Sequence, residues 1–537
     1  MFKTGSLCNF VPRFPTIGWF GLIFGLLWGV ACQTVTPTVP SSTTLPTVTI
    51  ETPVATVASP VATMPSAQVT APPETADSIR ELTILYTNDE HGWLAGMRPE
   101  QSAAHLVGLW QAEHGYEPDG AFLLISGGDM WTGPAISTWF QGESMADIMN
   151  AMGYAAAAVG NHEFDFGLDT LRLRAEQSHF PFLSANIRYR SDNSSPTDVG
   201  ILPFTITTVN DIQVGLIGLT TVRTPTTTNP NNVADFVFLD YETALREVVP
   251  QVRAAGAEMI VVPAHICQSE MMALAEAVAD LGISLLGGGH CNELFATERN
   301  GMVLLEGGFH LTSYAYATFQ FDTDADRVVE VRYGTGENVG GTAVPHLATL
   351  IQQWQTQANA ELNQIIGFTT NGIPRRSIAM QALITHAWLS AYPTANVAIT
   401  NLGGMRASIP PGDITLADII GVMPFDNVIV EVRLTGEQLI QTLDFANGQA
   451  AIGGARRVGG EWILTSNNEP IRRDGMYSLL VNDFMYAGGD GYGFLAEFNP
   501  DGYNTAIDWR QPVIDWIEAQ ASSPERPLDA TIEALTP

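Results

Sequence analysis

The chain has 537 residues, 45% of them hydrophobic, which is enough for at least two domains with separate cores. Its 56 acidic and 24 basic residues give a formal net charge of −32. This charge excludes a nucleic-acid polymer as the expected partner, because nothing cancels phosphate repulsion over a wide face. A small phosphorylated ligand stays compatible with the charge if metal ions and a few arginines gather at one site.

Residues 1–32 have the pattern of a secretory signal peptide. Lys3 and Arg13 precede an apolar run at residues 17–31, which is shorter than the roughly 20 residues of a membrane-spanning helix. The end of this run resembles a bacterial lipoprotein signal, so Cys32 is the candidate lipidation site. Simple secretion is the alternative, because Gly29 stands where a larger aliphatic residue is usual. The sequence therefore predicts export, with anchoring to a membrane through lipid on Cys32.

Residues 33–79 are dominated by Thr, Pro, Ser, Val and Ala and contain few charges. Such a composition does not build a packed core, and its prolines keep the chain extended. We interpret this segment as a linker that holds the folded part away from a membrane surface.

From residue 80 to residue 335, short apolar runs alternate with helical stretches, which predicts an α/β domain. The expected strands are rich in Val, Ile, Leu or Ala and lie at residues 82–86, 122–125, 155–159, 214–219, 259–262 and 283–286. Helical patterns at residues 106–113 and 241–255 lie between these strands.

Residues 336–365 contain a polar helical stretch that we expect to connect two domains. The second domain is expected at residues 366–521. Its expected strands are residues 397–400, 428–434 and 477–481, and its expected helices are residues 380–389 and 436–445. Residues 522–537 are expected to be a loose tail.

Side chains that can bind metal ions follow several of the predicted strands. These are Asp89, His91, Asp129, Asn161, His265, His290 and Asn292. Sites in α/β folds assemble at the carboxyl ends of strands. Imidazole, carboxylate and amide oxygen together suit two divalent ions such as Zn²⁺ or Mn²⁺. Taken singly, each residue also has a structural explanation, since Asp129 could cap a helix and each histidine could belong to a core.

The segments 88–91, 128–129, 160–163 and 289–290, together with His265, resemble the calcineurin-like metallophosphoesterase superfamily. The motif GNHEFDFG at residues 160–167 is similar to its 5′-nucleotidase branch, which includes bacterial periplasmic UDP-sugar hydrolases. The resemblance implies a four-layer β-sandwich flanked by helices at residues 80–335. It also implies a smaller α/β nucleotide-recognition domain at residues 366–521, with the site in the cleft between them.

The resemblance also assigns roles to the metal-binding residues. Asp89 and His91 would bind one ion, Asp129 would bridge both ions, and Asn161, His265 and His290 would bind the second. Asn292 stands where the family has Gln or His, so a shorter amide would complete the first site. His162 would face the phosphate and stabilise developing charge, and Asp165 would orient it.

Three segments of the second domain resemble the parts of this family that hold a nucleotide: residues 401–406, 424–427 and 482–492. The substrate-binding residues that this implies are Asn401, Arg406, Phe425, Asn427, Phe484 and Asp490. Arg406 would contact phosphate oxygens, the two phenyl rings would sandwich the base, and Asp490 would bind the ribose. The arginine that the family often carries near the first helix of this domain is Ala379 here, while Arg375 and Arg376 lie slightly earlier.

Taken together, the resemblance implies an exported hydrolase that releases phosphate from nucleoside 5′-phosphates by in-line attack of a metal-bound hydroxide. Hydrolysis of 2′,3′-cyclic nucleotides or UDP-sugars on the same site is one alternative, and the related thiosulfohydrolase reaction is a more remote one. From another class, the chain could be a surface binding protein with a relic site. Loss of metal binding with a preserved fold would support that alternative.

Other cysteines and histidines have no motif of their own. Cys267 and Cys291 each follow a histidine of the expected metal site, so they could pair outside the cytoplasm or remain free thiols. We expect a structural role for the histidines outside the motifs: His105, His114, His179, His310, His346 and His386.

Overall fold

The computed structural model describes residues 78–536, which belong to one compact unit. The expected signal peptide, the lipidation at Cys32 and residues 33–77 of the linker lie outside the described residues. Within the described range, no helix is both long and apolar enough to cross a membrane.

Two sheets form the N-terminal half. The first contains, in spatial order, β17 (Arg327–Glu337), β16 (Ser313–Asp322), β1 (Ile79–Thr87), β2 (Phe122–Ser126), β3 (Tyr154–Ala158), β4 (Phe182–Leu183) and β6 (Ile201–Leu202). The second contains β14 (Leu294–Arg299), β15 (Met302–Gly307), β13 (Leu285–Gly287), β11 (Met259–Val262), β8 (Ile212–Ile217) and β7 (Phe204–Val209). The strands β1, β2 and β3 run parallel to one another, as do β8, β11, β13 and β15. The carboxyl ends of the strands in each set therefore lie along the same edge of their sheet.

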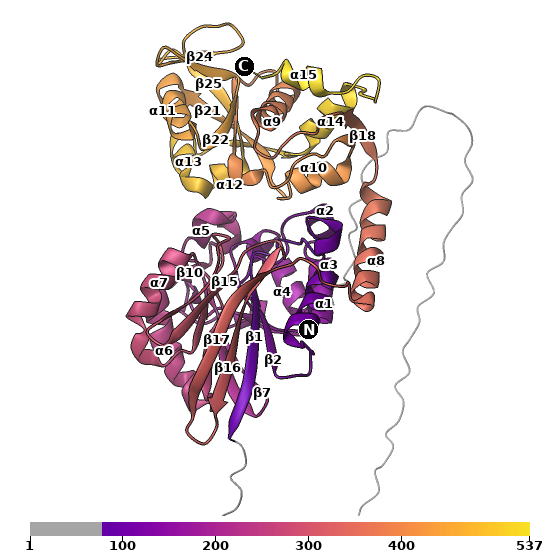
Figure 1. Ribbon diagram of the computed structural model, residues 1–537. Helices are drawn as coiled ribbons and strands as arrows, with labels where there is room; N and C mark the ends of the chain where they lie inside the picture. The colour runs from indigo at the N-terminus through magenta and orange to yellow at the C-terminus, as the bar shows by residue number, and fades with distance from the viewer. Residues whose placement is uncertain (1–77, 537) are drawn as a thin grey trace, which may run out of the picture. The chain divides into compact units, whose positions relative to one another are not determined.

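Alternating side chains of β1 show how the layers arise. Ile84 faces the core between the two sheets, where it joins Leu216 of β8, whereas Leu85 faces the opposite side. On that side the first sheet packs against α1 (Ala103–His114), α3 (Glu143–Met152) and α4 (Gly167–Gln177). The second sheet is covered by α6 (Tyr241–Ala254) and α7 (Gln268–Ala277) (Figure 1). The predicted helix–sheet–sheet–helix sandwich is confirmed.

A five-stranded sheet forms the centre of the C-terminal half. Its order is β22 (Ala450–Gly453), β19 (Val397–Asn401), β25 (Met476–Asn482), β21 (Val428–Thr435) and β26 (Tyr503–Asp508). Helices α9 (Ile378–Ala391) and α14 (Gln511–Ala519) share one core with it, and α11 (Gly436–Ala446) belongs to a second core. The long helix α8 (Pro345–Leu362) precedes this half, close to the stretch that was expected to connect two domains.

Residues 522–536 are not loose, which corrects the expected tail. They include α15 (Asp529–Glu533), and Leu528 and Ile532 are buried in the C-terminal core. Leu528 donates its N–H to the carbonyl of Phe368, and the Asp529 carboxylate accepts the N–H groups of Thr370 and Asn371. These apolar residues stand four apart in a short polar segment, so the sequence pattern was too brief to indicate a helix.

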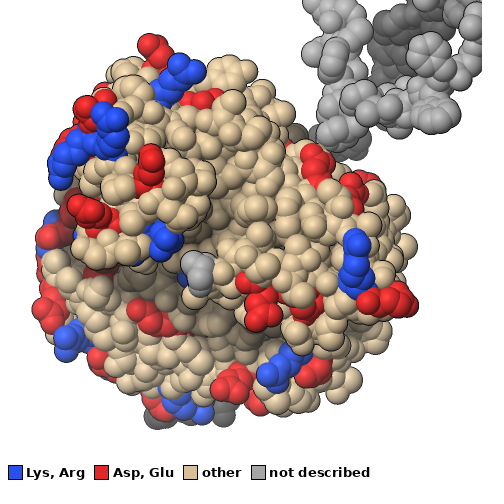
Figure 2. All heavy atoms as spheres, turned by 90° about the horizontal axis from the view of Figure 1, so that it is seen from above, with Lys and Arg blue, Asp and Glu red and all other residues tan. Residues whose placement is uncertain are grey.

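The hairpins at residues 294–337 were also not anticipated. They supply β14, β15, β16 and β17, whose outer strand β17 is half-exposed and largely polar. A strand with such a face lacks the apolar run that identified the central strands. On the face shown in Figure 2, acidic and basic side chains are interspersed, with no wide basic surface in view.

Candidate active site

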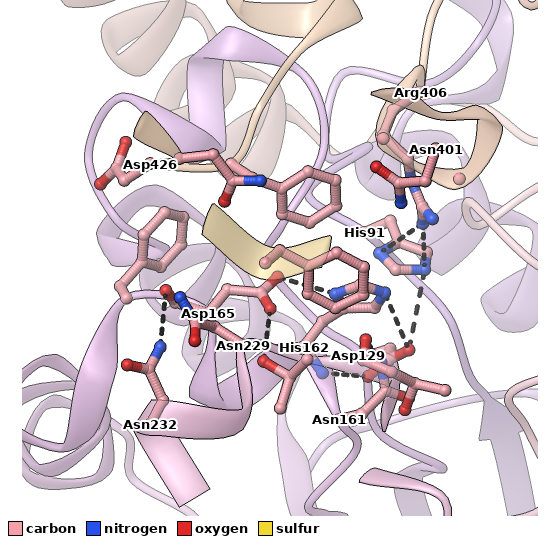
Figure 3. A pocket seen from close by; sticks show the side chains of 18 of the residues that line it. His91, Asp129, Asn161, His162, Asp165, Asn229, Asn232, Asn401, Arg406 and Asp426 are labelled. Atoms are coloured by element: carbon pink, nitrogen blue, oxygen red, sulfur yellow. Dashed lines mark hydrogen bonds and ion pairs between the residues drawn. The ribbon is translucent and has the colours of Figure 1, made fainter. Parts of the chain in front are cut away.

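The predicted metal ligands come together where parallel strands end. Asp89 and His91 follow β1, Asp129 follows β2, Asn161 follows β3, His265 ends β12 (Ala264–His265), and His290 and Asn292 follow β13. With the exception of His265, they line a pocket of about 430 Å³ (Figure 3). His265 is fully buried beside it, with its Nε2 atom 2.9 Å from Oδ2 of Asp129.

Two groups of side chains in this region are spaced closely enough to hold a metal ion, and they share Asp129. One group is His91, Asp129 and His162, and the other is Asp129, His265 and His290. Asp89 lies beside the first group, because its Oδ1 atom is 3.7 Å from Nε2 of His91. Asp129 is therefore the side chain common to both groups.

Backbone carbonyls orient two of the imidazoles. The Nδ1 atom of His91 lies 2.9 Å from the carbonyl oxygen of Thr132, and that of His265 lies 2.9 Å from the carbonyl oxygen of Gly127. Each Nδ1 atom therefore carries a proton and donates it, so Nε2 is the ring atom that would bind a metal ion. In this structure Nε2 of His91 instead meets Nη2 of Arg406, and Nε2 of His265 meets Oδ2 of Asp129, both at 2.9 Å.

Asn161 provides a test of whether a cation fits here. Its Nδ2 atom donates to the carbonyl of Thr227, but its buried Oδ1 atom has no hydrogen-bond partner in the structure. An unsatisfied buried carbonyl costs about 1–3 kcal/mol, and a divalent cation would remove that cost. The donor set of carboxylates, imidazoles and this amide oxygen therefore fits divalent metal ions.

Close packing of two loops requires a glycine. Gly128 has a φ of +93°, and a Cβ atom at this position would lie 2.7 Å from the backbone nitrogen of Gly160. Only glycine therefore allows the loop of Asp129 to approach the loop of Asn161 this closely.

Burial and mutual charge set the protonation of the ligand cluster. Burial opposes ionisation of Asp129, but the imidazoles of His265 and His162 hold the pKa of this carboxyl well below its usual range. Burial raises the pKa of Asp89 to about 6, against the opposing effect of His265. Burial together with His265 lowers the pKa of His290 to about 3. A neutral His290 imidazole is the form that binds metal ions.

His162 and Asp165 form a pair at the pocket wall. The Nδ1 atom of His162 lies 2.7 Å from Oδ2 of Asp165, whose Oδ1 atom accepts the hydroxyl of Thr228 at 2.9 Å. Burial disfavours the charged imidazole, but Asp165 and Asp129 outweigh it and raise the pKa of His162. The ring of Phe425 stacks on the imidazole, with centroids 5.6 Å apart. This arrangement can donate a proton or a hydrogen bond into the pocket.

Glu163 joins the two loops that carry Asp129 and Asn161, a role that sequence reasoning missed. Its buried carboxylate accepts backbone N–H groups from Gly160, Asp129 and Met130 at 2.6, 2.9 and 2.8 Å. Its place inside the GNHE motif was the available signal.

Asn88 supports the first ligand loop in the same way. Its Nδ2 atom donates to Oδ2 of Asp89 and to the carbonyl of Gly308, both at 2.8 Å, and its Oδ1 atom accepts the N–H of Gly307.

All the residues predicted to bind the nucleotide line the same pocket: Asn401, Arg406, Phe425, Asn427, Phe484 and Asp490. Asp490 is held by the side-chain amide of Asn401 at 2.8 Å, and Asn401 in turn accepts the amide of Asn482 at 2.9 Å. Arg406 donates from Nη2 to Nε2 of His91 at 2.9 Å, so its guanidinium lies at the first metal-binding group.

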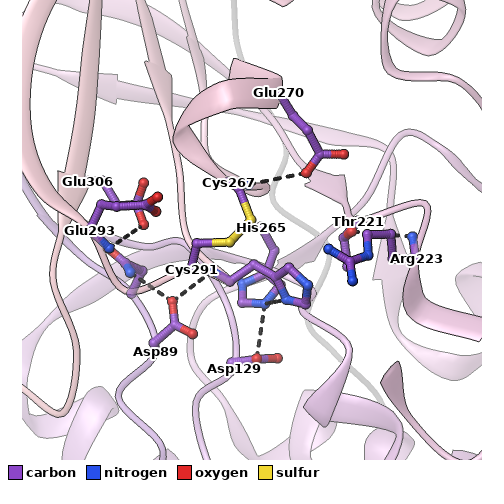
Figure 4. Close-up of a disulfide and its surroundings, with 12 residues drawn as sticks. Asp89, Asp129, Thr221, Arg223, His265, Cys267, Glu270, Cys291, Glu293 and Glu306 are labelled. Carbon is purple, nitrogen blue, oxygen red and sulfur yellow. Dashed lines mark hydrogen bonds and ion pairs between the residues drawn. A yellow bond between two sulfur atoms is a disulfide. The ribbon is translucent and has the colours of Figure 1, made fainter. Parts of the chain in front are cut away.

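Cys267 and Cys291 form a disulfide, which decides between the two alternatives left open by the sequence (Figure 4). The bond joins the loop that follows His265 to the loop that carries His290, and the two Cα atoms are 5.1 Å apart. It therefore cross-links the two loops that supply imidazoles to one metal-binding group.

His310 lies next to the site, although its sequence context indicated only a structural role. Its ring stacks on Trp93 with centroids 4.9 Å apart and meets the ring of His91 edge-on at 5.8 Å. It also lines a second cavity beside the pocket. No motif surrounds this histidine, so packing alone reveals its position.

Comparison with known proteins agrees with this geometry. Residues 355–497 match the model of the 5′-nucleotidase C-terminal domain. The chain is 28% identical over 500 residues to the trifunctional nucleotide phosphoesterase protein YfkN of Bacillus subtilis, with 79% of this chain and 33% of that protein covered. It thus spans about a third of the length of this relative.

The chain is also 27% identical over 491 residues to the 5′-nucleotidase of Bos taurus, with 78% of this chain and 85% of that protein covered. Among solved structures, the 5′-nucleotidase precursor of Thermus thermophilus shares the fold, with a TM-score of 0.70 at 22% identity. That match covers 83% of this chain and 97% of the other. Residues 355–497 thus match a 5′-nucleotidase C-terminal domain, and the chain is similar over most of its length to a nucleotide phosphoesterase and to 5′-nucleotidases.

Proposed function

We propose that this chain is an exported, two-metal phosphoesterase that converts nucleoside 5′-phosphates to nucleoside and phosphate. Its similarity to 5′-nucleotidases over most of its length supports a hydrolase that acts on phosphoester bonds. The observation that carries the finer proposal is the pair of metal-binding groups that share Asp129 in a pocket also lined by Phe425 and Phe484. In this proposal, one pocket would hold the phosphate at the metal-binding groups and the base between the two phenyl rings.

Two divalent ions are the cofactors that this site would hold. Asp89, His91 and Asn292 would hold one ion, Asp129 would bridge, and Asn161, His265 and His290 would hold the other. Such ions, when bound, polarise the phosphoryl group and provide an activated nucleophile near neutral pH. The unpartnered Oδ1 atom of Asn161 supports this assignment, as do the Nδ1–carbonyl bonds of His91 and His265, which turn both Nε2 atoms towards Asp129.

His162 is the proposed general acid and charge stabiliser. Its Nδ1 atom is bound by Asp165, which directs Nε2 towards Asp129 at 4.0 Å, on the side where the phosphate would lie. From there Nε2 can hydrogen-bond the oxygen on which charge develops or protonate the departing alkoxide of the nucleoside. Arg406 would share the phosphate charge, because its planar fork matches two oxygens.

The nucleoside would be held by the C-terminal half. Phe425 and Phe484 would stack against the base, which tolerates different bases because every base has a π-face. Asp490, fixed by Asn401, would accept ribose hydroxyl groups. The same machinery suits 2′,3′-cyclic nucleotides and UDP-sugars, so these belong in the substrate panel.

Export is proposed from two observations. Residues 1–32 have a signal-peptide pattern, and the Cys267–Cys291 disulfide is of a type that persists in oxidising compartments.

The test is turnover of AMP, 2′,3′-cyclic AMP and UDP-glucose by the full chain with Mn²⁺ or Zn²⁺, with the products of each substrate separated by chromatography. His162→Ala should lower kcat for AMP roughly 10²–10⁴-fold. The matched control His179→Ala, at an exposed histidine, should leave the rate unchanged. A folded, metal-loaded chain that releases no phosphate from AMP would overturn the proposal.

A further inference from the structure

The loop at residues 227–232 forms part of the wall of the nucleotide pocket, although no motif marked it in the sequence. It connects α5 (Thr224–Thr227) to the short helix η4 (Pro230–Val233). Its side chains that line the pocket are Thr227, Thr228, Asn229 and Asn232. The hydrogen bonds of this loop lead to residues that the proposed reaction uses.

Thr228 holds the carboxylate that orients His162. The side chain of Thr228 is 2% exposed, and its hydroxyl donates to Oδ1 of Asp165 at 2.9 Å. The other carboxylate oxygen, Oδ2, lies 2.7 Å from Nδ1 of His162. The χ2 torsion of an aspartate varies widely when nothing restrains it, and a bond to each oxygen removes that freedom. The Thr228 hydroxyl therefore fixes the direction in which Asp165 meets the imidazole.

The same loop orients a side chain of the second metal-binding group. The carbonyl of Thr227 accepts the Nδ2 atom of Asn161 at 3.1 Å. A carbonyl can accept only from the nitrogen of an amide, so this bond determines which end of Asn161 points away from the loop. That end is the buried Oδ1 atom, which has no hydrogen-bond partner in the structure.

Asn232 fastens the loop to the segment that carries these residues. Its Nδ2 atom donates to the carbonyls of Phe164 and Asp165 at 2.8 and 3.3 Å (Figure 3). Within the loop, Oδ1 of Asn229 accepts the N–H of Asn231 at 3.1 Å and caps η4. Both ends of the loop are thus bound to residues 161–165, so a displacement of the loop would move Asn161 and Asp165 together.

We propose that Thr228 is a positioning residue for His162 that acts through Asp165, and that residues 227–232 hold this pair in a fixed relation to Asn161. The inference rests on the proposed function, because it concerns the proton that His162 would give to the departing alkoxide. Without the hydroxyl, Oδ1 of Asp165 is a buried acceptor that lacks a donor, and the carboxylate is free to turn away from the imidazole. Steps that need this proton should then slow, whereas binding of metal ions and substrate should not weaken.

The first experiment compares variants of the full, metal-loaded chain with AMP as substrate. Thr228→Val removes the hydroxyl and should lower kcat roughly tenfold, as expected for the loss of a hydrogen bond to a charged group, with KM and bound metal unchanged. Thr228→Ser keeps the hydroxyl and should restore most of the rate. Thr226→Val removes an exposed hydroxyl from the neighbouring helix and should behave as the wild type does.

Two aryl phosphates separate the positioning of a proton donor from a general structural role. p-Nitrophenolate is a good leaving group that departs without a proton, whereas phenolate is a poorer one that gains from a general acid. Thr228→Val should therefore slow phenyl phosphate hydrolysis about as strongly as AMP hydrolysis and leave p-nitrophenyl phosphate hydrolysis nearly unchanged. Equal slowing of both aryl phosphates, or no slowing of phenyl phosphate, would overturn the inference.

A double variant tests whether Thr228 acts through Asp165. In an Asp165→Asn chain, Thr228→Val should have little further effect, because residues that act as one unit give non-additive losses. Fully additive losses would contradict the inference. Asn232→Ala, which frees the loop from two carbonyls, should also slow phenyl phosphate hydrolysis and provides a second test if Thr228→Val does not fold.

The aryl phosphates also keep this inference distinct from the proposed function. A wild-type chain that hydrolyses phenyl phosphate but not AMP would contradict the nucleotide substrate, while the comparison of Thr228 variants would still decide the role of this residue. A wild-type chain that hydrolyses AMP at the same kcat as Thr228→Val would overturn the role of Thr228 alone.

Discussion

Removing the Cys267–Cys291 disulfide should weaken both the local stability of the active site and its hold on metal ions. The bond links segments 24 residues apart in the sequence, immediately beyond the two histidines of one metal-binding group. In the double variant Cys267→Ser/Cys291→Ser, these loops are joined only through the sheet. Serine preserves the size of both side chains, and at position 267 it also suits the residue that precedes helix α7.

The magnitude follows from loop-closure entropy. A cross-link that closes a loop of this length stabilises the folded state by about 3.5 kcal/mol at 25 °C. The loss of stability caused by the double substitution should be largest in residues 267–291, the segment that the disulfide closes. The affinity for metal ions should fall roughly 10–100-fold, as it does when groups that orient metal ligands are removed. His265 keeps its bond to the Gly127 carbonyl, so part of the geometry should survive.

Hydrogen exchange of the metal-free chain measures the first effect, and competition with a chelating dye measures the second. Peptides from residues 259–292 should exchange much faster in the double variant, while peptides from β19 in the C-terminal half should be unchanged. Dithiothreitol should reproduce the effect in the wild type and have none in the double variant. Equal exchange and equal metal affinity in the two proteins would refute a positioning role for the disulfide.

Three further predictions concern single side chains. Asp165→Asn should lower kcat for AMP roughly 10–100-fold with little change in KM, because His162 loses a charged hydrogen bond at 2.7 Å. Steady-state assays check this, and an unchanged kcat would show that Asp165 has no role in the mechanism. Glu163→Ala should lower the free energy of unfolding by roughly 3 kcal/mol or more, since three buried N–H groups lose their acceptor, and thermal unfolding checks this. Phe425→Ala should raise KM for AMP about tenfold through lost stacking, whereas KM for a substrate without a base, such as p-nitrophenyl phosphate, should not change.

The central strands could be predicted from the sequence because burial on both faces leaves a clear signal. Runs such as residues 82–86 and 259–262 are almost continuously apolar, as strands between two layers must be. The outer strand β17 and helix α15 escaped prediction because half-exposed or very short elements carry little periodicity. Their positions depend on contacts with distant parts of the chain.

The candidate site was predictable to the extent that its residues follow those strands. Asp129 and Asn161 come directly after parallel strands, so their proximity follows from the topology. Nothing in the spacing of Cys267 and Cys291 could decide whether they pair, because a disulfide depends on the distance between their Cα atoms. His310 and Arg375 lie in different halves of the chain, and only packing brings both to one cavity.

The most direct test of the account is the number of metal ions that activity requires. The full chain would be stripped with EDTA, dialysed, and titrated with Mn²⁺ or Zn²⁺ while bound metal and AMP hydrolysis are followed together. Activity should be absent at first and should return as two ions bind per chain, whereas Asp129→Ala should not recover it. AMP hydrolysis by the metal-free chain, or full activity restored by an Asp129→Ala chain, would contradict it.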